Sequence, residues 1–115
     1  MLQPNKAYAA WIALLFAMVT TPDVSHGQDA SRAVRRGERL VSAHCVMCHA
    51  TRGGGASPHR EAPELANVLQ RYPVESLQES LTEGLTSGHP DMPVFRFSDG
   101  DAAAILAYLR SIQRR

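Results

Sequence analysis

Residues 45–49, Cys-Val-Met-Cys-His, hold both cysteines of this 115-residue chain and decide what its fold is built around. Several kinds of site use two cysteines at this spacing. A thioredoxin-like redox site requires a scaffold that contains a β-sheet, and no stretch of this sequence alternates convincingly as a strand. A structural zinc site requires four ligands, whereas only His44 and His49 flank the thiols. The disulfide of an exported protein is the plain structural alternative.

The pattern C-x-x-C-H is also the signature of covalent haem attachment. In that chemistry each thiol adds to one vinyl group of the porphyrin, and the two-residue spacer lets both thiols reach the same ring. The histidine is then held beneath the iron, where its imidazole coordinates as the proximal ligand. We therefore predict one haem c, bound covalently through Cys45 and Cys48, with His49 as a metal ligand. The histidine directly after the second cysteine favours this interpretation over a disulfide.

A second axial ligand is expected, because iron in an electron carrier is usually six-coordinate. The chain has four methionines. Met1 and Met18 precede the region that we expect to fold, and Met47 is tethered too near His49 to cross the ring. Met92 remains, in a loop whose flanking prolines restrict the unbound conformers. We predict Met92 as the distal metal ligand; the alternative is a methionine that fills a gap in the core.

Histidines are the rival distal ligands. His59 and His89 lie in predicted loops, where a histidine is more often solvated than bound to iron, and His89 shares its loop with Met92. His44 directly precedes the first cysteine and has the same geometric problem as Met47. The identity of the ligand matters, because His/Met ligation raises the reduction potential relative to two imidazoles.

The N-terminus has the layout of a secretory signal peptide. Residues 1–6 are short and polar with one positive charge, residues 7–19 are almost wholly apolar, and residues 25–27 offer small side chains at the −3 and −1 positions of a cleavage site. The apolar run is shorter than the roughly 18 to 20 residues that a membrane span needs. An uncleaved membrane anchor is the alternative.

We accordingly expect a signal peptide over residues 1–27, cleaved after Gly27, and one mature domain over residues 28–115. Export fits the haem hypothesis, since c-type haem is attached outside the bacterial cytoplasm. The expected localisation is periplasmic.

Length and charge limit the function classes. A chain of 115 residues has room for one domain, and so small a mature part often depends on a metal, a disulfide or a prosthetic group. The formal net charge of +1 gives no strongly basic balance for nucleic acid. We expect no nucleic-acid partner, no stable membrane insertion and a monomer.

Apolar periodicity predicts an all-α domain. A first helix is expected over residues 31–45, a short helix over residues 64–70, and a third that begins at Pro73 and ends at Gly84 or Gly88.

Ser98 and Asp101 form a capping box that is expected to open the last helix. Two long loops, over residues 51–63 and 86–97, connect the helices. The apolar stripe of the last helix consists of Ala102, Ile105, Leu106, Leu109 and Ile112.

With these residues placed, the chain resembles the class I c-type cytochromes, the family of the small soluble cytochromes c. The resemblance extends over about residues 32–112. Gly37 matches the small residue at which the first and last helices of that family cross, and Tyr108 matches the aromatic residue of the crossing. The family usually carries an aromatic residue four positions before the first cysteine, where this chain has Val41. The Met92-Pro93 pair resembles the family's distal-ligand loop.

The resemblance also covers the proximal side of the haem. Pro63 matches the proline whose carbonyl accepts a hydrogen bond from the proximal histidine, which would orient His49, and Leu65 matches an apolar residue on the same haem face. The resemblance implies the all-α cytochrome c fold, with three to four helices around one covalently bound haem. It further implies that the N- and C-terminal helices cross near a right angle and that one haem edge is exposed.

The expected function is the transfer of single electrons between redox protein partners, and no residue needs to act as acid, base or nucleophile, so we do not expect an enzyme. One alternative is a haem subunit of a dehydrogenase or oxidase complex. Another is a haem with an open distal position that binds peroxide or a gas. Three arginines are candidates to pair with the haem propionates: Arg52, Arg60 and Arg71. A further set on the first helix either steers an acidic partner or forms a solvated face: Arg32, Arg35, Arg36 and Arg39.

Overall fold

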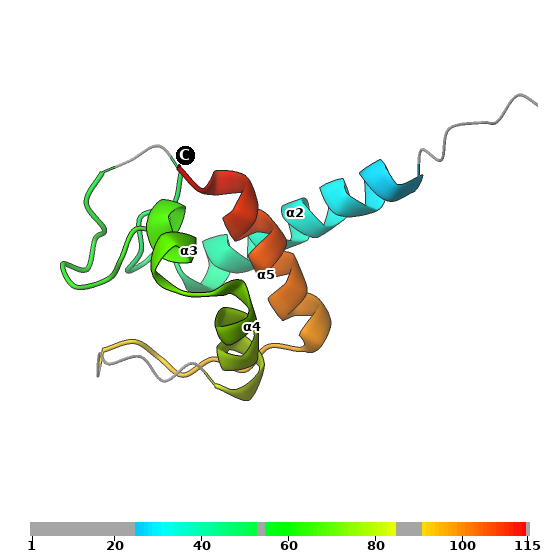
Figure 1. The fold of residues 1–115 in the computed structure, drawn as a ribbon. Helices are drawn as coiled ribbons and strands as arrows, with labels where there is room; N and C mark the ends of the chain where they lie inside the picture. Colours follow the sequence, from blue (N-terminus) through cyan, green and yellow to red (C-terminus); the bar gives the residue numbers. More distant parts are fainter. Residues whose placement is uncertain (1–24, 53–54, 85–90, 115) are drawn as a thin grey trace, which may run out of the picture.

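The computed structural model of the protein describes residues 25–52, 55–84 and 91–114, and these residues contain helices and no strand (Figure 1). In chain order the elements are α2 (Ser25–His44), the 3-10 helix η1 (Leu65–Asn67), α3 (Val68–Arg71), α4 (Val74–Glu83) and α5 (Asp99–Ile112). The predicted all-α class is confirmed. No helix within these ranges is long and apolar enough to span a membrane.

Helix α2 begins at Ser25, earlier than the expected start near residue 31, and its first part projects from the rest of the domain (Figure 1). The extension is held by local contacts: the Ser31 hydroxyl donates to the Gly27 carbonyl, and Arg32 pairs with Asp29 at 3.2 Å. The predicted cleavage site after Gly27 therefore falls inside a helical turn. The remaining leader, residues 1–24, lies outside the described ranges, and the cleavage stays a prediction.

Helices α2 and α5 cross in direct backbone contact. A Cβ added to Gly37 would overlap the carbonyl oxygen of Ala104 and would approach the Cβ of Tyr108 to 2.8 Å. Tyr108 is 4% exposed and Val41, in place of the family's usual aromatic residue, is 1% exposed. The expected crossing is confirmed, and the smaller side chain at position 41 packs completely into the core.

Helix α5 supplies most of the core. All five residues of its predicted apolar stripe are buried. At its N-terminus the Ser98 hydroxyl accepts a hydrogen bond from the Asp101 backbone amide, so the predicted cap is present. The Asp101 carboxylate also lies 2.7 Å from the guanidinium of Arg36, which joins the start of α5 to α2.

The two central helices are short. Helices η1 and α3 together span residues 65–71, close to the predicted 64–70, and α4 ends at Gly84, whose φ of 115° lies in the region that favours glycine. Gly84 is thus the terminating residue among the two proposed, and Gly88 lies outside the described residues. The Phe97 amide donates to the Leu81 carbonyl at 2.8 Å, which fixes the chain that leads into α5.

The ion pair at the helix crossing predicts an acid-dependent stability. The hydrogen bond from Arg36 holds the pKa of the Asp101 carboxyl below its ordinary value, and Ser98 acts in the same direction. A carboxyl with a lowered pKa in the folded state stabilises the protein above its unfolded pKa of about 3.9, and this stabilisation is lost as the pH falls through the folded value. We expect Arg36→Gln to reduce the free energy of unfolding at pH 7, with a smaller difference from the unaltered protein below about pH 3.

Urea unfolding of the two proteins across this pH range measures the effect. Arg35→Gln is the matched control, because Arg35 is exposed on the same helix and makes no ion pair with the described residues. An Arg36→Gln difference that stayed constant down to the lowest pH would contradict the contribution of the Asp101 charge.

Candidate haem site

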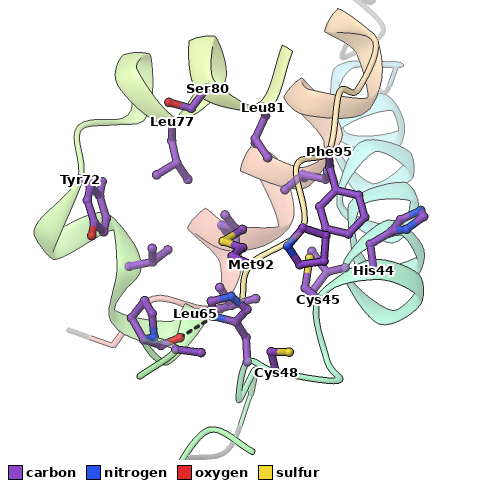
Figure 2. Close-up of a pocket in the computed structure, with 18 of the residues that line it drawn as sticks. His44, Cys45, Cys48, Leu65, Tyr72, Leu77, Ser80, Leu81, Met92 and Phe95 are labelled. Atoms are coloured by element: carbon purple, nitrogen blue, oxygen red, sulfur yellow. Dashed lines mark hydrogen bonds between the residues drawn. The ribbon is translucent and has the colours of Figure 1, made fainter. Parts of the chain in front are cut away.

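A cavity of about 510 Å³ lies at the centre of the described residues. Its size is within the range of about 300–1,000 Å³ that is usual for small-molecule and cofactor sites. The four predicted site residues, Cys45, Cys48, His49 and Met92, all line it. Figure 2 shows both cysteines and Met92 on its wall, with residues of α4 on another side. The fold therefore brings the sequence-predicted set to one place.

The cysteine pair lies on a turn that continues α2. The Cys45 amide donates to the Val41 carbonyl at 2.8 Å, and the His49 amide donates to the Cys45 carbonyl at 2.9 Å. This turn directs both thiols to the same cavity. Burial raises the pKa of the Cys45 thiol to about 11, which is opposite to the lowered pKa of a catalytic redox cysteine. The environment of Cys45 therefore does not fit a thioredoxin-like site.

His49 is oriented by the backbone opposite to it. Its Nδ1 lies 2.8 Å from the carbonyl oxygen of Pro63, the contact that the resemblance implied (Figure 2). Since a carbonyl oxygen only accepts, Nδ1 carries the proton and Nε2 keeps its lone pair for a metal. Leu65, also expected on this face, is 7% exposed and lines the cavity.

Met92 lies on a segment that is tied to the opposite part of the chain. Asp91, its neighbour, pairs with Nε2 of His59 at 3.2 Å, and the His59 amide donates to the Cys48 carbonyl at 3.1 Å. The Met92 segment is thereby linked to the cysteine motif across the mouth of the cavity. His89 lies outside the described residues.

These contacts also bear on the rival ligands. In His59, Nε2 faces Asp91 and Nδ1 accepts from the Glu61 amide, so both ring nitrogens have protein partners. The ring of His44 packs against Phe95 and Phe97, with centroid distances of 5.4 and 5.6 Å.

The far wall was not predicted from the sequence. Tyr72, Leu77 and Ser80 lie on the side of the cavity away from the cysteines (Figure 2). Ser76 and Ser80 share one face of α4 at the spacing of one helical turn. That spacing was a usable indication, since polar and apolar residues of α4 line the same cavity. Of the three arginine candidates, Arg71 lines this cavity, whereas Arg52 and Arg60 do not.

Comparison with known proteins decides the family. The family model described as Cytochrome c matches residues 34–113. The chain belongs to the cytochrome c family. A curated relative, a nitric oxide reductase subunit from Halomonas halodenitrificans, is 32% identical over 75 residues, which cover 56% of this chain and 48% of that protein. The chain thus spans about half the length of that relative. No solved structure matches this chain significantly.

Membership implies a covalently bound haem c, and the residues of this cytochrome c fit it. Two cysteines at the required spacing face one cavity, an imidazole presents an unprotonated nitrogen, and the cavity wall is largely apolar, with Val41, Leu77, Leu81 and Ile105 among its residues. The family carries electrons, while the relative is by name part of a reductase.

Proposed function

We propose that this cytochrome c transfers single electrons, with haem attached at Cys45 and Cys48 and with His49 and Met92 as the axial ligands of its iron. The observation that carries the proposal is the convergence of these four side chains on one cavity of about 510 Å³. The bound haem supplies a one-electron couple between ferric and ferrous iron. The protein supplies the attachment, the ligands and the surroundings.

Each residue has a separate task in this proposal. Cys45 and Cys48 hold the macrocycle, so that the cofactor is retained whatever its oxidation state. Pro63 fixes the ring of His49, so that the lone pair of Nε2 stays directed into the cavity. Met92 offers a neutral thioether, a soft donor that favours ferrous iron more than an imidazole does.

The surroundings favour electron transfer over catalysis. An apolar wall keeps water from the iron, so little solvent has to reorient when the charge changes. Two ligands leave no coordination position for a substrate. At the motif itself, Met47 is 82% exposed and Val46 is 39% exposed. A partner can therefore approach closely beside the thioether bonds, where an electron has the shortest path.

Carbon monoxide tests the proposal against an open haem that binds peroxide or gas. The protein is produced with its leader in a host that attaches c-type haem, and the covalent haem is verified on the denatured chain. We expect the ferrous protein to show a low-spin spectrum that carbon monoxide leaves unchanged. Tight binding of carbon monoxide to the unaltered protein would overturn the proposal in favour of the open site.

Arg71 is the arginine that we propose for the propionates. The propionates of haem lie on the edge opposite to the vinyl groups, and Arg71 lines the cavity whose other side holds the cysteines. Removing a positive charge near the haem stabilises the ferric form. We expect Arg71→Leu to lower the reduction potential by an amount on the order of tens of mV, measured by redox titration. Arg60→Leu is the control, and an equal shift in both variants would refute the specific role of Arg71.

A second candidate, a haem subunit of a larger complex, rests on the similarity to a reductase subunit. We propose export to the periplasm in either case. Mild purification of the chain from its native membrane and soluble fractions distinguishes the two. A monomer that exchanges electrons with several proteins supports the free carrier, whereas stable co-purification with one membrane complex supports membership of that complex.

A further inference from the structure

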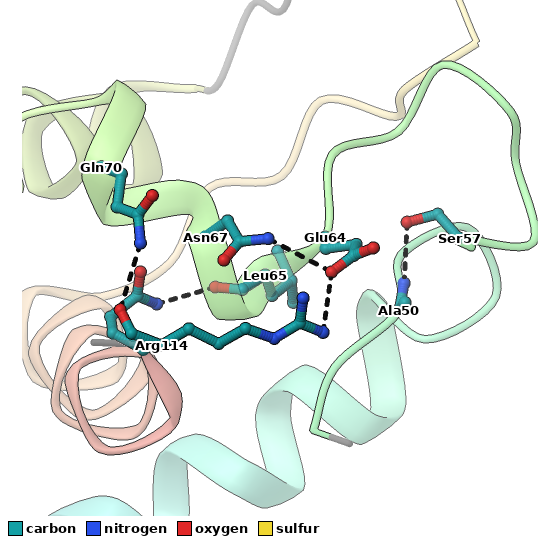
Figure 3. A network of polar contacts seen from close by, with 8 residues as sticks. Ala50, Ser57, Glu64, Leu65, Asn67, Gln70 and Arg114 are labelled. Atoms are coloured by element: carbon teal, nitrogen blue, oxygen red, sulfur yellow. Dashed lines mark hydrogen bonds and ion pairs between the residues drawn. The ribbon is translucent and has the colours of Figure 1, made fainter. Parts of the chain in front are cut away.

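Gln113, directly after α5, joins three elements through one side chain (Figure 3). Its Nε2 donates to the carbonyl of Leu65 at 2.7 Å and to that of Leu109 at 2.9 Å. Its Oε1 accepts from the amide of Leu69 at 3.1 Å. The carboxamide is half-buried, where an unpaired polar group costs about 1–3 kcal/mol. Gln113 therefore holds η1 and α3 against the end of α5.

Arg114 adds two further contacts to the same segment. Its backbone amide donates to the Ala66 carbonyl at 2.9 Å, and its guanidinium lies 3.0 Å from the Glu64 carboxylate (Figure 3). Glu64 also accepts from the side chain of Asn67 at 3.2 Å. We refer to Gln113 and Arg114 as the C-terminal clamp. It contacts three consecutive residues, 64–66, from one side.

The other side of this segment contacts the haem motif. The Leu65 amide donates to the Ala50 carbonyl at 2.9 Å, one residue beyond His49. The Pro63 carbonyl accepts from Nδ1 of His49 at 2.8 Å. The Ala50 amide is in turn bonded to the Ser57 hydroxyl at 3.0 Å (Figure 3). Residues 63–66 thus lie between the clamp and the histidine.

We infer that Gln113 and Arg114 are positioning residues for His49, because they fix the segment whose carbonyl orients the imidazole. This inference rests on the proposed function, in which His49 binds the iron. The clamp acts through position alone and contacts neither the iron ligand nor the cavity. Its partners are separated from it by 44 and 48 residues in the chain, so the end of the domain controls the ligand near its beginning.

The chemistry gives the effect a direction. A hydrogen bond from Nδ1 to a carbonyl makes the imidazole a stronger donor to the metal, and a stronger donor stabilises ferric iron more than ferrous iron. When the clamp is removed, the Pro63 carbonyl loses its fixed position and this hydrogen bond weakens. The reduction potential is then expected to rise.

The experiment compares Gln113→Leu with Gln70→Leu in the haem-loaded protein. Gln70 belongs to the same network, since its Nε2 donates to the Arg114 carbonyl at 3.1 Å, but it does not contact residues 63–66. For Gln113→Leu we expect the ferrous form to gain about threefold over the ferric form, a rise of about 30 mV for a one-electron couple. The Nδ1 proton of His49 is expected to exchange with solvent at least threefold faster, measured by NMR of the ferrous protein. Gln70→Leu is expected to change neither quantity.

A second variant, Glu64→Gln, removes the ion pair with Arg114 but keeps the backbone hydrogen bonds, and it is expected to show a smaller change in the same direction. It decides the question if Gln113→Leu does not accumulate. A loss of thermal stability in both variants, with potential and proton exchange unchanged, would overturn the inference and leave the clamp a purely structural contact.

The same spectra separate this outcome from a failure of the proposed function. The ring protons of an axial histidine are strongly shifted by the haem ring current. If the unaltered protein lacked such shifts for His49, the ligation itself would be wrong. If the shifts are present and only the exchange rates agree between variants, the clamp alone is refuted.

Discussion

Met92→Ala is expected to lower the reduction potential by an amount on the order of 100 mV or more, within the range of about 0.8 V that axial ligands span. The thioether is the only proposed distal ligand, and its loss leaves water or no ligand in its place. Ferric iron gains relative to ferrous iron, and the sulfur-to-iron charge-transfer band of the oxidised protein disappears. The vacant position should also bind carbon monoxide in the ferrous state. Redox titration and optical spectroscopy measure all three effects.

Met47→Ala is the matched control for this experiment. Met47 lies between the two cysteines but is 82% exposed, so its loss should leave the potential, the band and the resistance to carbon monoxide unchanged. Retention of the charge-transfer band in Met92→Ala would place the distal ligand elsewhere. Met92→His is expected to keep the iron six-coordinate while lowering the potential, because an imidazole replaces the thioether.

Gly37→Ala is expected to reduce the free energy of unfolding by about 3 kcal/mol, at the upper end of what an overpacked contact usually costs. The added methyl group would overlap the Ala104 carbonyl, which belongs to the backbone and has no rotamer by which to move away. Helices α2 and α5 would have to separate, which opens the core around Tyr108 and Val41. Denaturant unfolding of the haem-loaded protein measures the loss.

Gly100→Ala provides the control within α5. A Cβ at Gly100 meets nothing within 4 Å, and alanine is the better helix former by roughly 0.5–1 kcal/mol. Its stability should be unchanged or slightly higher. Equal stabilities of Gly37→Ala and Gly100→Ala would show that the helix crossing can widen at no cost.

The sequence predicted the parts of this protein that are encoded locally. The C-x-x-C-H motif, the cap at Ser98 and the stripe of α5 each depend on residues within a few positions of one another. Gly37 and Pro63 were placed only through their register with that motif, and the structure shows their contacts.

The contacts that escaped prediction join residues far apart in the chain. Gln113 has no periodicity, charge or motif that would distinguish it from any polar residue at the end of a helix. Its partners at Leu65 and Leu69 are backbone groups, which every residue has, so no sequence pattern identifies them. The His44–Phe95 packing is similar, since it needs the path of the whole chain between the two rings. The start of α2 at Ser25 was missed because polar residues give no apolar stripe to follow.

The crossing of α2 and α5 also determines the order of events as the chain is made. These helices are the first and last of the described domain, so their contact closes a loop that contains nearly every other element, and this closure carries the largest entropic cost in the fold. Synthesis and export proceed from the N-terminus. Cys45 and Cys48 therefore emerge while α5 is still absent, and no native core can yet cover them. The topology keeps the attachment site open for as long as haem has to be delivered, and the last helix completes the domain around it.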